Sequence, residues 1–183
     1  MTYNENNPAT LFVESEVSGK ILFCDEGLSF WGGVDPNTAK IVDTHHPNHG
    51  ECVAGRIVMM PSSRGSCSSS GVLLQLALSG LAPAALIFCE NEQVLTLGAL
   101  ISDRLFNCPV AIVRLPRRIY GELSLAKEAE IKNVTLHFLQ KTIPLILPSN
   151  KGLKLTKTDS QMLKGNQGKA KKMAMEIICL MAG

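Results

Sequence analysis

Aromatic side chains make up only 5% of this 183-residue sequence, although 45% of its residues are hydrophobic. A packed core must therefore be built mainly from Val, Ile, Leu, Ala and Met. No apolar run reaches the roughly 20 residues that a membrane-spanning helix needs. The polar N-terminal segment also lacks the positive region and apolar core of a secretory signal. We therefore expect a soluble, cytoplasmic protein that does not contact membranes.

The six cysteines form no C-x-x-C pair and follow no zinc or iron-sulfur spacing. Several stand in apolar runs, the usual setting of a buried free thiol, as Cys89 and Cys179 do. His137 also lies in an apolar run, where we expect a partnered, partly buried imidazole. Three further histidines lack the spacing of a helical zinc site, so we expect a surface or interface loop and no metal there: His45, His46 and His49.

Charge is divided unevenly along the chain. Residues 1–150 carry eleven Lys and Arg against fourteen Asp and Glu, whereas residues 151–183 carry seven Lys against two acids. The basic tail has no interleaved aromatic residues and no nucleic-acid-binding motif, so we expect a solvated helix face and no nucleic acid partner. Its pattern predicts a short helix over 158–165 and an amphipathic helix over 168–181. Residues 1–8 are polar, and we expect them to be disordered.

Apolar runs and turn residues predict an α/β fold. We expect residues 11–13 and 21–24 to be two strands joined by a turn at Ser18-Gly19-Lys20. Two successive βαβ units follow, which imply a partly parallel sheet. Residues 114–133 are charged and show no clear pattern. The remaining predicted strands are 40–43, 57–60, 84–88, 109–113, 134–139 and 143–147, and the predicted helices are 72–79 and 97–106.

A serine-rich loop stands between the first predicted strand and helix of these units. Residues 62–70 contain six Ser, one Arg and no large apolar side chain. Ser70 is a plausible N-cap, and a helix N-terminus with Arg64 beside it favours a bound carboxylate or phosphate. The loop also follows a buried strand, where open α/β sheets bind ligands. A flexible surface connection is the alternative, and the pattern is neither a Walker loop nor a dinucleotide fingerprint.

Five motifs, in this order, resemble the small swivelling domain of the aconitase X family over about residues 9–115. They are Leu28-Ser29-Phe30-Trp31-Gly32-Gly33-Val34-Asp35, His45-His46-Pro47, Val53-Ala54-Gly55-Arg56, Arg64-Gly65-Ser66 and Ala82-Pro83-Ala84-Ala85. Segments between Leu155 and Met175 resemble the opening of the family's large catalytic domain. The resemblance implies a swivelling β/β/α domain over 9–148, followed by a helical tail, 149–183, that begins a truncated large domain.

The resemblance also implies a function. Aconitase X enzymes are hydro-lyases that dehydrate small hydroxy acids, for example cis-3-hydroxy-L-proline or mevalonate 5-phosphate. Their iron or iron-sulfur centre is held by cysteines of the large domain. We therefore expect no cofactor on this chain, a large catalytic domain or subunit as partner, and a small anionic substrate. Alone, the chain is expected to be inactive.

By the same resemblance, Ser66 is the proton acceptor. The neighbouring loop residues Arg64, Gly65, Cys67 and Ser68 are the expected substrate contacts. Cys67 is a rival nucleophile, but no activating histidine is identifiable in the sequence. Two other functions stay open: a truncated, non-catalytic swivel-domain protein, and an unrelated anion-binding module that uses the serine-rich loop.

Overall fold

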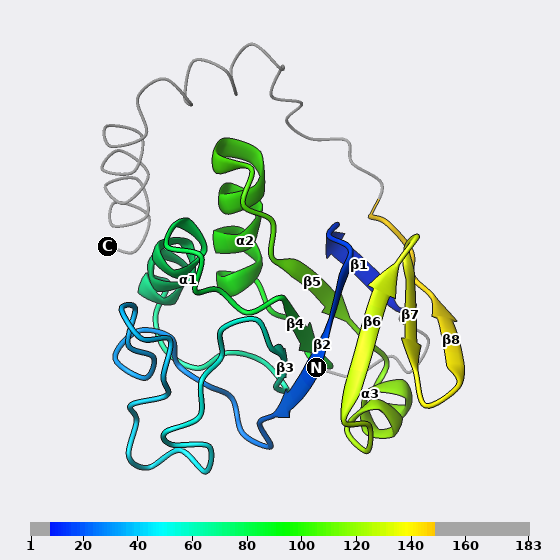
Figure 1. The fold of residues 1–183 in the computed structure, drawn as a ribbon, viewed down its shortest axis with the longest axis horizontal. Helices are drawn as coiled ribbons and strands as arrows, with labels where there is room; N and C mark the ends of the chain where they lie inside the picture. Colours follow the sequence, from blue (N-terminus) through cyan, green and yellow to red (C-terminus); the bar gives the residue numbers. More distant parts are fainter. Residues whose placement is uncertain (1–7, 149–183) are drawn as a thin grey trace.

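The computed structural model describes residues 8–148, which form one eight-stranded sheet and three helices (Figure 1). The predicted disordered start and the two predicted C-terminal helices lie outside these residues, apart from Pro8. The strands are β1 (Thr10–Val13), β2 (Val17–Phe23), β3 (Ile57–Met59), β4 (Ala85–Phe88), β5 (Ala111–Arg114), β6 (Glu128–Lys132), β7 (Thr135–Phe138) and β8 (Lys141–Pro144), and the helices are α1 (Ser68–Leu78), α2 (Val94–Phe106) and α3 (Arg117–Leu123).

The sheet is mixed, with strand order β1-β5-β4-β3-β2-β6-β7-β8. Its four central strands, β2 to β5, are parallel, as the two predicted βαβ units require. β1 adds an antiparallel edge next to β5, and β6 to β8 form an antiparallel meander that starts beside β2. β3 and β4 are buried at every residue, because helices or other strands cover both of their faces. The predicted α/β class with a partly parallel sheet is therefore confirmed.

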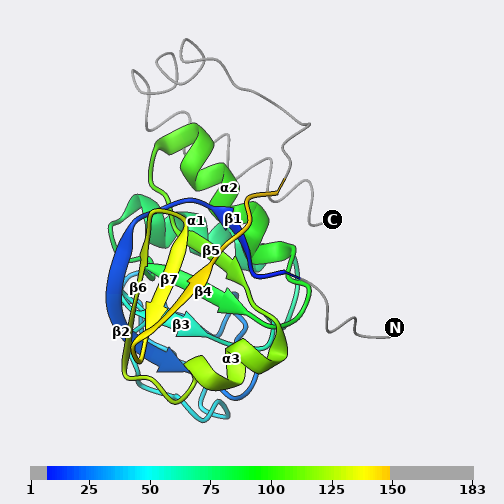
Figure 2. The same cartoon turned by 90° about the vertical axis from the view of Figure 1, so that its right-hand side faces the viewer.

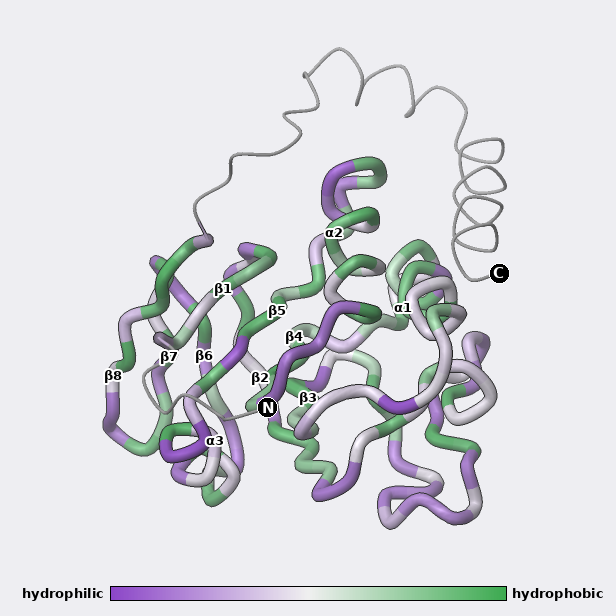
Figure 3. Tube along the Cα trace, turned by 180° about the vertical axis from the view of Figure 1, so that it is seen from behind, coloured by the Kyte–Doolittle hydropathy of each residue, from purple (hydrophilic) through white to green (hydrophobic). Residues whose placement is uncertain are grey.

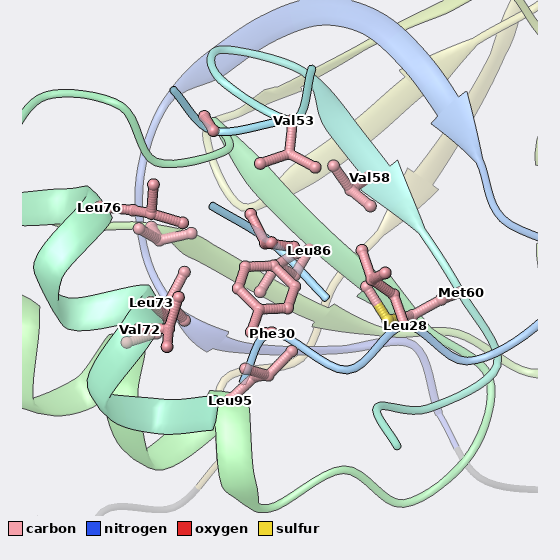
Figure 4. Packing of buried hydrophobic residues seen from close by; sticks show 14 of the residues in the cluster. Leu28, Phe30, Val53, Val58, Met60, Val72, Leu73, Leu76, Leu86 and Leu95 are labelled. Carbon is pink, nitrogen blue, oxygen red and sulfur yellow. The ribbon is translucent and has the colours of Figure 1, made fainter. Parts of the chain in front are cut away.

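Two cores lie on opposite faces of the sheet. On one face α1, α2 and the long β2–β3 connection enclose Phe30, which packs with Leu73, Leu86 and Leu95 (Figure 4). On the other face α3 and the curled meander cover Ile57, Ile87 and their neighbours. Figure 2 shows α1 and α2 on the side of the sheet opposite α3.

The β2–β3 connection contains no helix or strand of its own. Its outer turns are hydrophilic (Figure 3), and the predicted strand over 40–43 is reduced to isolated bridges from Lys40 and Ile41. Asp35 organises the first turn, because its carboxylate accepts hydrogen bonds from the Asn37 N–H and the Thr38 hydroxyl. Both bonds favour the ionised carboxylate and lower the pKa of Asp35.

The expected turn at Ser18-Gly19-Lys20 is wrong, because β2 runs straight through it. The N-terminal half of β2 pairs with β6, and β1 pairs with β5 instead of β2. Gly19 is needed within the strand for close packing: a Cβ there would lie 3.1 Å from the carbonyl oxygen of Gly55. Here glycine marks a close backbone approach and not a turn.

The three histidines that were expected in one surface or interface loop differ in burial. His45 is exposed, but His46 is only 2% exposed, and its Nδ1 accepts a hydrogen bond from the Asn48 N–H at 3.1 Å. Asn48 in turn donates to the carbonyl of Phe23, which fastens this loop to the end of β2. His137 is half-buried and contacts the Thr142 hydroxyl, as expected.

Candidate functional site

The carboxyl ends of the four parallel strands meet at one edge of the sheet, where ligands bind in open α/β folds. The chain segments that leave these ends are hydrogen-bonded to one another. The Cys24 N–H donates to the Met59 carbonyl at 2.8 Å, and the Glu90 N–H donates to the Pro61 carbonyl at 2.9 Å. The serine-rich loop therefore starts from a fixed point between the ends of β2 and β4.

Helix α1 begins earlier than the sequence predicted. It starts at Ser68 with Cys67 as N-cap, so Ser70 is buried in the first turn and is not the N-cap. The Ser70 hydroxyl donates to the Cys67 carbonyl at 2.6 Å, a local bond that occupies it inside the helix. The predicted cap was wrong because three consecutive serines, Ser68 to Ser70, all suit a helix start by residue type alone.

Ser66 stands just before this helix and is exposed. Its Oγ accepts a hydrogen bond from the Ser68 N–H at 3.4 Å, and its carbonyl accepts one from the Ser69 N–H at 3.1 Å. The hydroxyl oxygen thus faces a donor at the positive end of a helix. Such donors stabilise negative charge on the oxygen.

Cys67 is also exposed, and its side chain makes no capping hydrogen bond to α1. His46, the buried histidine, is bonded within its own loop and not to this thiol. The thiol and the Ser66 hydroxyl are therefore adjacent groups on the same exposed turn.

The loop packs against the Leu28–Asp35 motif, so the structure brings together two of the five motifs. The Trp31 N–H donates to the Ser69 hydroxyl at 3.2 Å, and the Arg64 N–H donates to the Leu28 carbonyl at 3.3 Å. Gly65 has φ of +96°, and a Cβ there would lie 2.8 Å from the Ser29 hydroxyl. Glycine at this position both permits the turn and leaves room for Ser29.

Arg64 is half exposed, and its guanidinium lies 3.3 Å from the carboxylate of Glu26, which follows β2. An exposed pair of this kind contributes little stability, so it does not bury the cation. Gly27 brings the two segments close, because a Cβ there would lie 2.6 Å from the Ser62 carbonyl oxygen and 2.8 Å from Arg64 Cγ. Arg64 remains able to meet an anion at the loop.

Two carboxylates that are not among the predicted site residues also lie at this edge. Glu90 follows β4, pairs with Arg117 at 2.6 Å and accepts a hydrogen bond from the Ser62 hydroxyl at 3.4 Å. Glu92 accepts hydrogen bonds from both the backbone N–H and the hydroxyl of Ser63. Both residues follow shortly after β4, the parallel neighbour of β3. This position in the sequence could have identified them as site residues.

Behind the strand ends lie three weakly acidic side chains that stay protonated. Burial raises the pKa of Cys24 to about 11 and raises the pKa of Cys89 above its ordinary value. Burial also raises the pKa of Tyr120, whose buried hydroxyl has no hydrogen-bond partner among the described residues. These three groups are therefore uncharged, and they lie behind the charged side chains at this edge of the sheet.

Residues 8–148 contain no group of three or more His, Cys, Asp or Glu side chains arranged to hold a metal ion. Their five free cysteines are spread over strand ends and loops, and two of the five are buried. The described part of the chain therefore does not fit an iron or iron-sulfur centre by itself. Among the same residues, no helix is long and apolar enough to cross a membrane.

Comparison with known proteins connects this edge to a family. The family model of the aconitase X swivel domain matches residues 8–137. The chain belongs to the aconitase X family. The matched part covers β1 to β6 and most of β7, including the serine-rich loop and every motif on which the resemblance rested.

Individual relatives agree with this assignment. The aconitase X swivel-domain chain is 37% identical to cis-3-hydroxy-L-proline dehydratase of Hypocrea jecorina over 98% of its own length and 32% of the relative's. It is 41% identical to the phosphomevalonate dehydratase small subunit of Methanopyrus kandleri over 53% of its length and 73% of the relative's. The chain spans about a third of the length of the cis-3-hydroxy-L-proline dehydratases that it matches.

A solved structure confirms the fold. The crystal structure of Thermococcus kodakaraensis aconitase X (holo-form) superposes with a TM-score of 0.60 at 28% identity, and it covers 72% of this chain and 96% of that chain. The described sheet and helices therefore have the swivel fold of aconitase X. The relatives are dehydratases, so the family chemistry is that of a hydro-lyase.

Proposed function

We propose that this chain is the swivel-domain part of an aconitase X-type dehydratase of a small hydroxy acid, and that Ser66 is its proton acceptor. The observation that carries the proposal is the position of the Ser66 hydroxyl. It is exposed at the carboxyl end of the parallel strands and accepts a hydrogen bond from the first residue of α1. The family match and the dehydratase relatives support the reaction class.

Dehydration of a hydroxy acid removes a proton from the carbon beside the carboxylate and expels hydroxide from the next carbon. A serine hydroxyl is a poor base, so its alkoxide must be stabilised by fixed donors. The Ser68 N–H and the positive end of α1 supply such a field at Ser66. This chain's share of the reaction is therefore to take the proton.

Arg64 is proposed to bind the substrate anion. Its guanidinium presents several N–H donors, and its present partner, Glu26, is an exposed carboxylate that a substrate carboxylate or phosphate can replace. The backbone at Gly65, Cys67 and Ser68 completes the proposed substrate-binding turn. The exposed Gly65, Cys67 and half-exposed Ser68 leave this turn open to a small ligand.

The rest of the active site is proposed to come from a large catalytic domain or subunit of the aconitase X type. In the Methanopyrus kandleri relative the swivel-type chain is named as a small subunit, which supports assembly with a large partner. The iron or iron-sulfur centre that the family implies belongs, in this proposal, to that partner, because the described residues offer no set of ligands for it.

Among substrates, cis-3-hydroxy-L-proline is the first to test. Two dehydratases named for it match 98% and 96% of this chain, whereas two phosphomevalonate dehydratase small subunits match 53% and 46% of it. Mevalonate 5-phosphate is the comparison substrate, since it carries both anion types that Arg64 could bind.

The deciding experiment is Ser66→Ala in the chain assembled with the large aconitase X domain or subunit. We expect the substrate KM to change little and kcat to fall by a factor of about 10² to 10⁴, the usual cost of losing a positioned base. Loss of water from cis-3-hydroxy-L-proline, followed by mass spectrometry, measures turnover.

Three neighbouring substitutions serve as controls. Ser62→Ala and Ser68→Ala remove hydroxyls from the same loop and should reduce kcat far less than Ser66→Ala. Cys67→Ala should also be mild. Wild-type kcat in Ser66→Ala would refute the assignment, and a collapse in Cys67→Ala alone would move the catalytic role to the thiol. No dehydration by any assembled form would favour a non-catalytic swivel-domain protein.

A further inference from the structure

The carboxylate of Glu92 joins two loops that leave neighbouring parallel strands. Its Oε2 accepts hydrogen bonds from the Ser63 N–H at 2.8 Å and from the Ser63 hydroxyl at 2.6 Å. Its Oε1 accepts a third bond from the Leu95 N–H, in the first turn of α2, at 2.7 Å. All three bonds are short and have a carboxylate acceptor, which makes them stronger than bonds between neutral groups.

The serine-rich loop has few other anchors before α1. The bond from the Ser62 hydroxyl to Glu90 is 3.4 Å long, and the Arg64 N–H reaches the Leu28 carbonyl at 3.3 Å. Within residues 8–148, Ser66 is hydrogen-bonded locally, to Ser68 and Ser69. At its far end the loop is held by the buried first turn of α1, where Ser69 is bonded to Trp31. The two bonds from Ser63 to Glu92 are therefore shorter than the other bonds that hold the loop on the strand side of the proposed proton acceptor.

We propose that Glu92 is a positioning residue for Ser66. It holds Ser63, three residues before Ser66, at the N-terminus of α2. The backbone between Ser63 and the first turn of α1 is thereby restricted to one conformation. The Ser66 hydroxyl then stays beside the Ser68 N–H that stabilises its alkoxide. This inference rests on the proposed function of Ser66, and nothing in the family assignment requires it.

A capping role at the start of α2, beside the N-cap residue Gln93, is the simpler reading of Glu92, and it accounts for the bond to Leu95. It does not account for the two bonds to Ser63. A carboxylate used only as a cap needs one oxygen and leaves the other to solvent. Here the second oxygen accepts hydrogen bonds from both the N–H and the hydroxyl of Ser63. The Glu92 side chain therefore binds the start of α2 and the serine-rich loop at the same time.

The chemistry demands a carboxylate. The Ser63 N–H and the Leu95 N–H are backbone donors that point at fixed positions, so both side-chain oxygens must accept. In Glu92→Gln one oxygen becomes an amide NH₂, which opposes one of these donors. The substitution keeps size and shape while it releases either the loop or the helix.

The test uses the chain assembled with its large aconitase X domain or subunit. For Glu92→Gln we expect kcat per folded enzyme to fall about 10- to 100-fold with KM within about threefold, because small misplacements of a reacting group cost up to about 10²-fold. Ser63→Ala keeps the backbone bond and should lower kcat by about 3- to 10-fold. Glu122→Gln, which removes an ion pair with Lys141 on the far face, is the matched control and should keep wild-type kcat.

Hydrogen exchange separates positioning from simple stability. In Glu92→Gln the hydrogen-bonded amides of Ser63, Arg64, Ser68 and Ser69 should exchange at least tenfold faster than in the wild type, while β3 and β4 keep their protection. A lower Tm with wild-type kcat per folded enzyme in both Glu92→Gln and Ser63→Ala would show that Glu92 is only a cap and would overturn the proposal. Ser63→Ala decides the matter in the same way if Glu92→Gln does not fold.

The two proposals fail differently. Wild-type turnover in Ser66→Ala removes the proposed function whatever Glu92 does. Collapse of turnover in Ser66→Ala together with wild-type kcat in both Glu92→Gln and Ser63→Ala keeps the proposed function and removes the positioning role.

Discussion

The thiol of Cys24 is fully buried where β2 ends. Burial, helped by the negative charge of Glu51, raises its pKa from an ordinary 9.0 to about 11. Between these values the unfolded chain releases the proton while the folded chain keeps it, so the free energy of unfolding must fall as pH rises. We expect this thiol to cost about 1 kcal/mol of stability between pH 8 and pH 10.

Urea unfolding at pH 8 and pH 10 measures this loss. In Cys24→Ala the decline in unfolding free energy should be smaller by that amount, because the titrating group is gone. Cys67→Ala, which removes an exposed thiol, should retain the wild-type decline. Equal declines in Cys24→Ala and the wild type would contradict the assignment of this pH dependence to Cys24.

Single residues of the site differ in how far sequence could find them. Ser66 and Arg64 stand in a loop whose unusual composition singles it out in the sequence, and the family resemblance then points to Ser66 within it. Glu26 lies 36 positions before that loop and Glu92 lies 22 positions after it, and only the parallel pairing of β2, β3 and β4 brings them to it. The serine-rich loop was therefore predictable from local sequence, whereas the contact between Ser63 and Glu92 was not.

Among the elements, the α1–α2 crossing depends on a glycine inside a helix. A Cβ at Gly98 of α2 would lie 2.7 Å from the carbonyl oxygen and 3.0 Å from the Cα of Ser70 in α1. Backbone atoms cannot yield as a side-chain tip can, so Gly98→Ala must push the helices apart. We expect a destabilisation of about 1–3 kcal/mol, the usual cost of overpacking, despite the better helix propensity of alanine.

Gly121→Ala is the matched control, since nothing lies within 4 Å of a Cβ at this position in α3. Propensity alone should then stabilise the protein by about 0.5–1 kcal/mol. Thermal or urea unfolding of both variants gives the comparison. The same sign of change in both would show that the close contact at Gly98 relaxes without cost.

Most elements followed the sequence where apolar residues ran together or repeated with a helical period. The predicted strand 143–147 is an exception, because β8 spans Lys141–Pro144 and only an isolated bridge at Ile146 follows it. Strands β3, β4 and β5 and both crossover helices were found, although α2 starts three residues earlier than predicted. β6 was missed although its residues alternate between exposed and buried, because three of the five are charged. The seven-residue α3 is too short for a periodic pattern to stand out.

At the scale of the whole molecule, we expect the chain alone to lack part of the active site. The described residues provide Ser66 as the proposed proton acceptor and Arg64 as a cation that can bind an anion. They provide no set of ligands for a metal ion. A hydro-lyase must also expel hydroxide, for which a base is of no use. The purified chain should therefore leave cis-3-hydroxy-L-proline and mevalonate 5-phosphate unchanged, and anaerobic treatment with iron and sulfide should build no stoichiometric cluster on it.

Adding the large aconitase X partner should restore loss of water from one of the two substrates. Turnover by the isolated chain, or a cluster with matching iron content that disappears on Cys→Ala substitution, would show that the chain carries more of the active site than we propose.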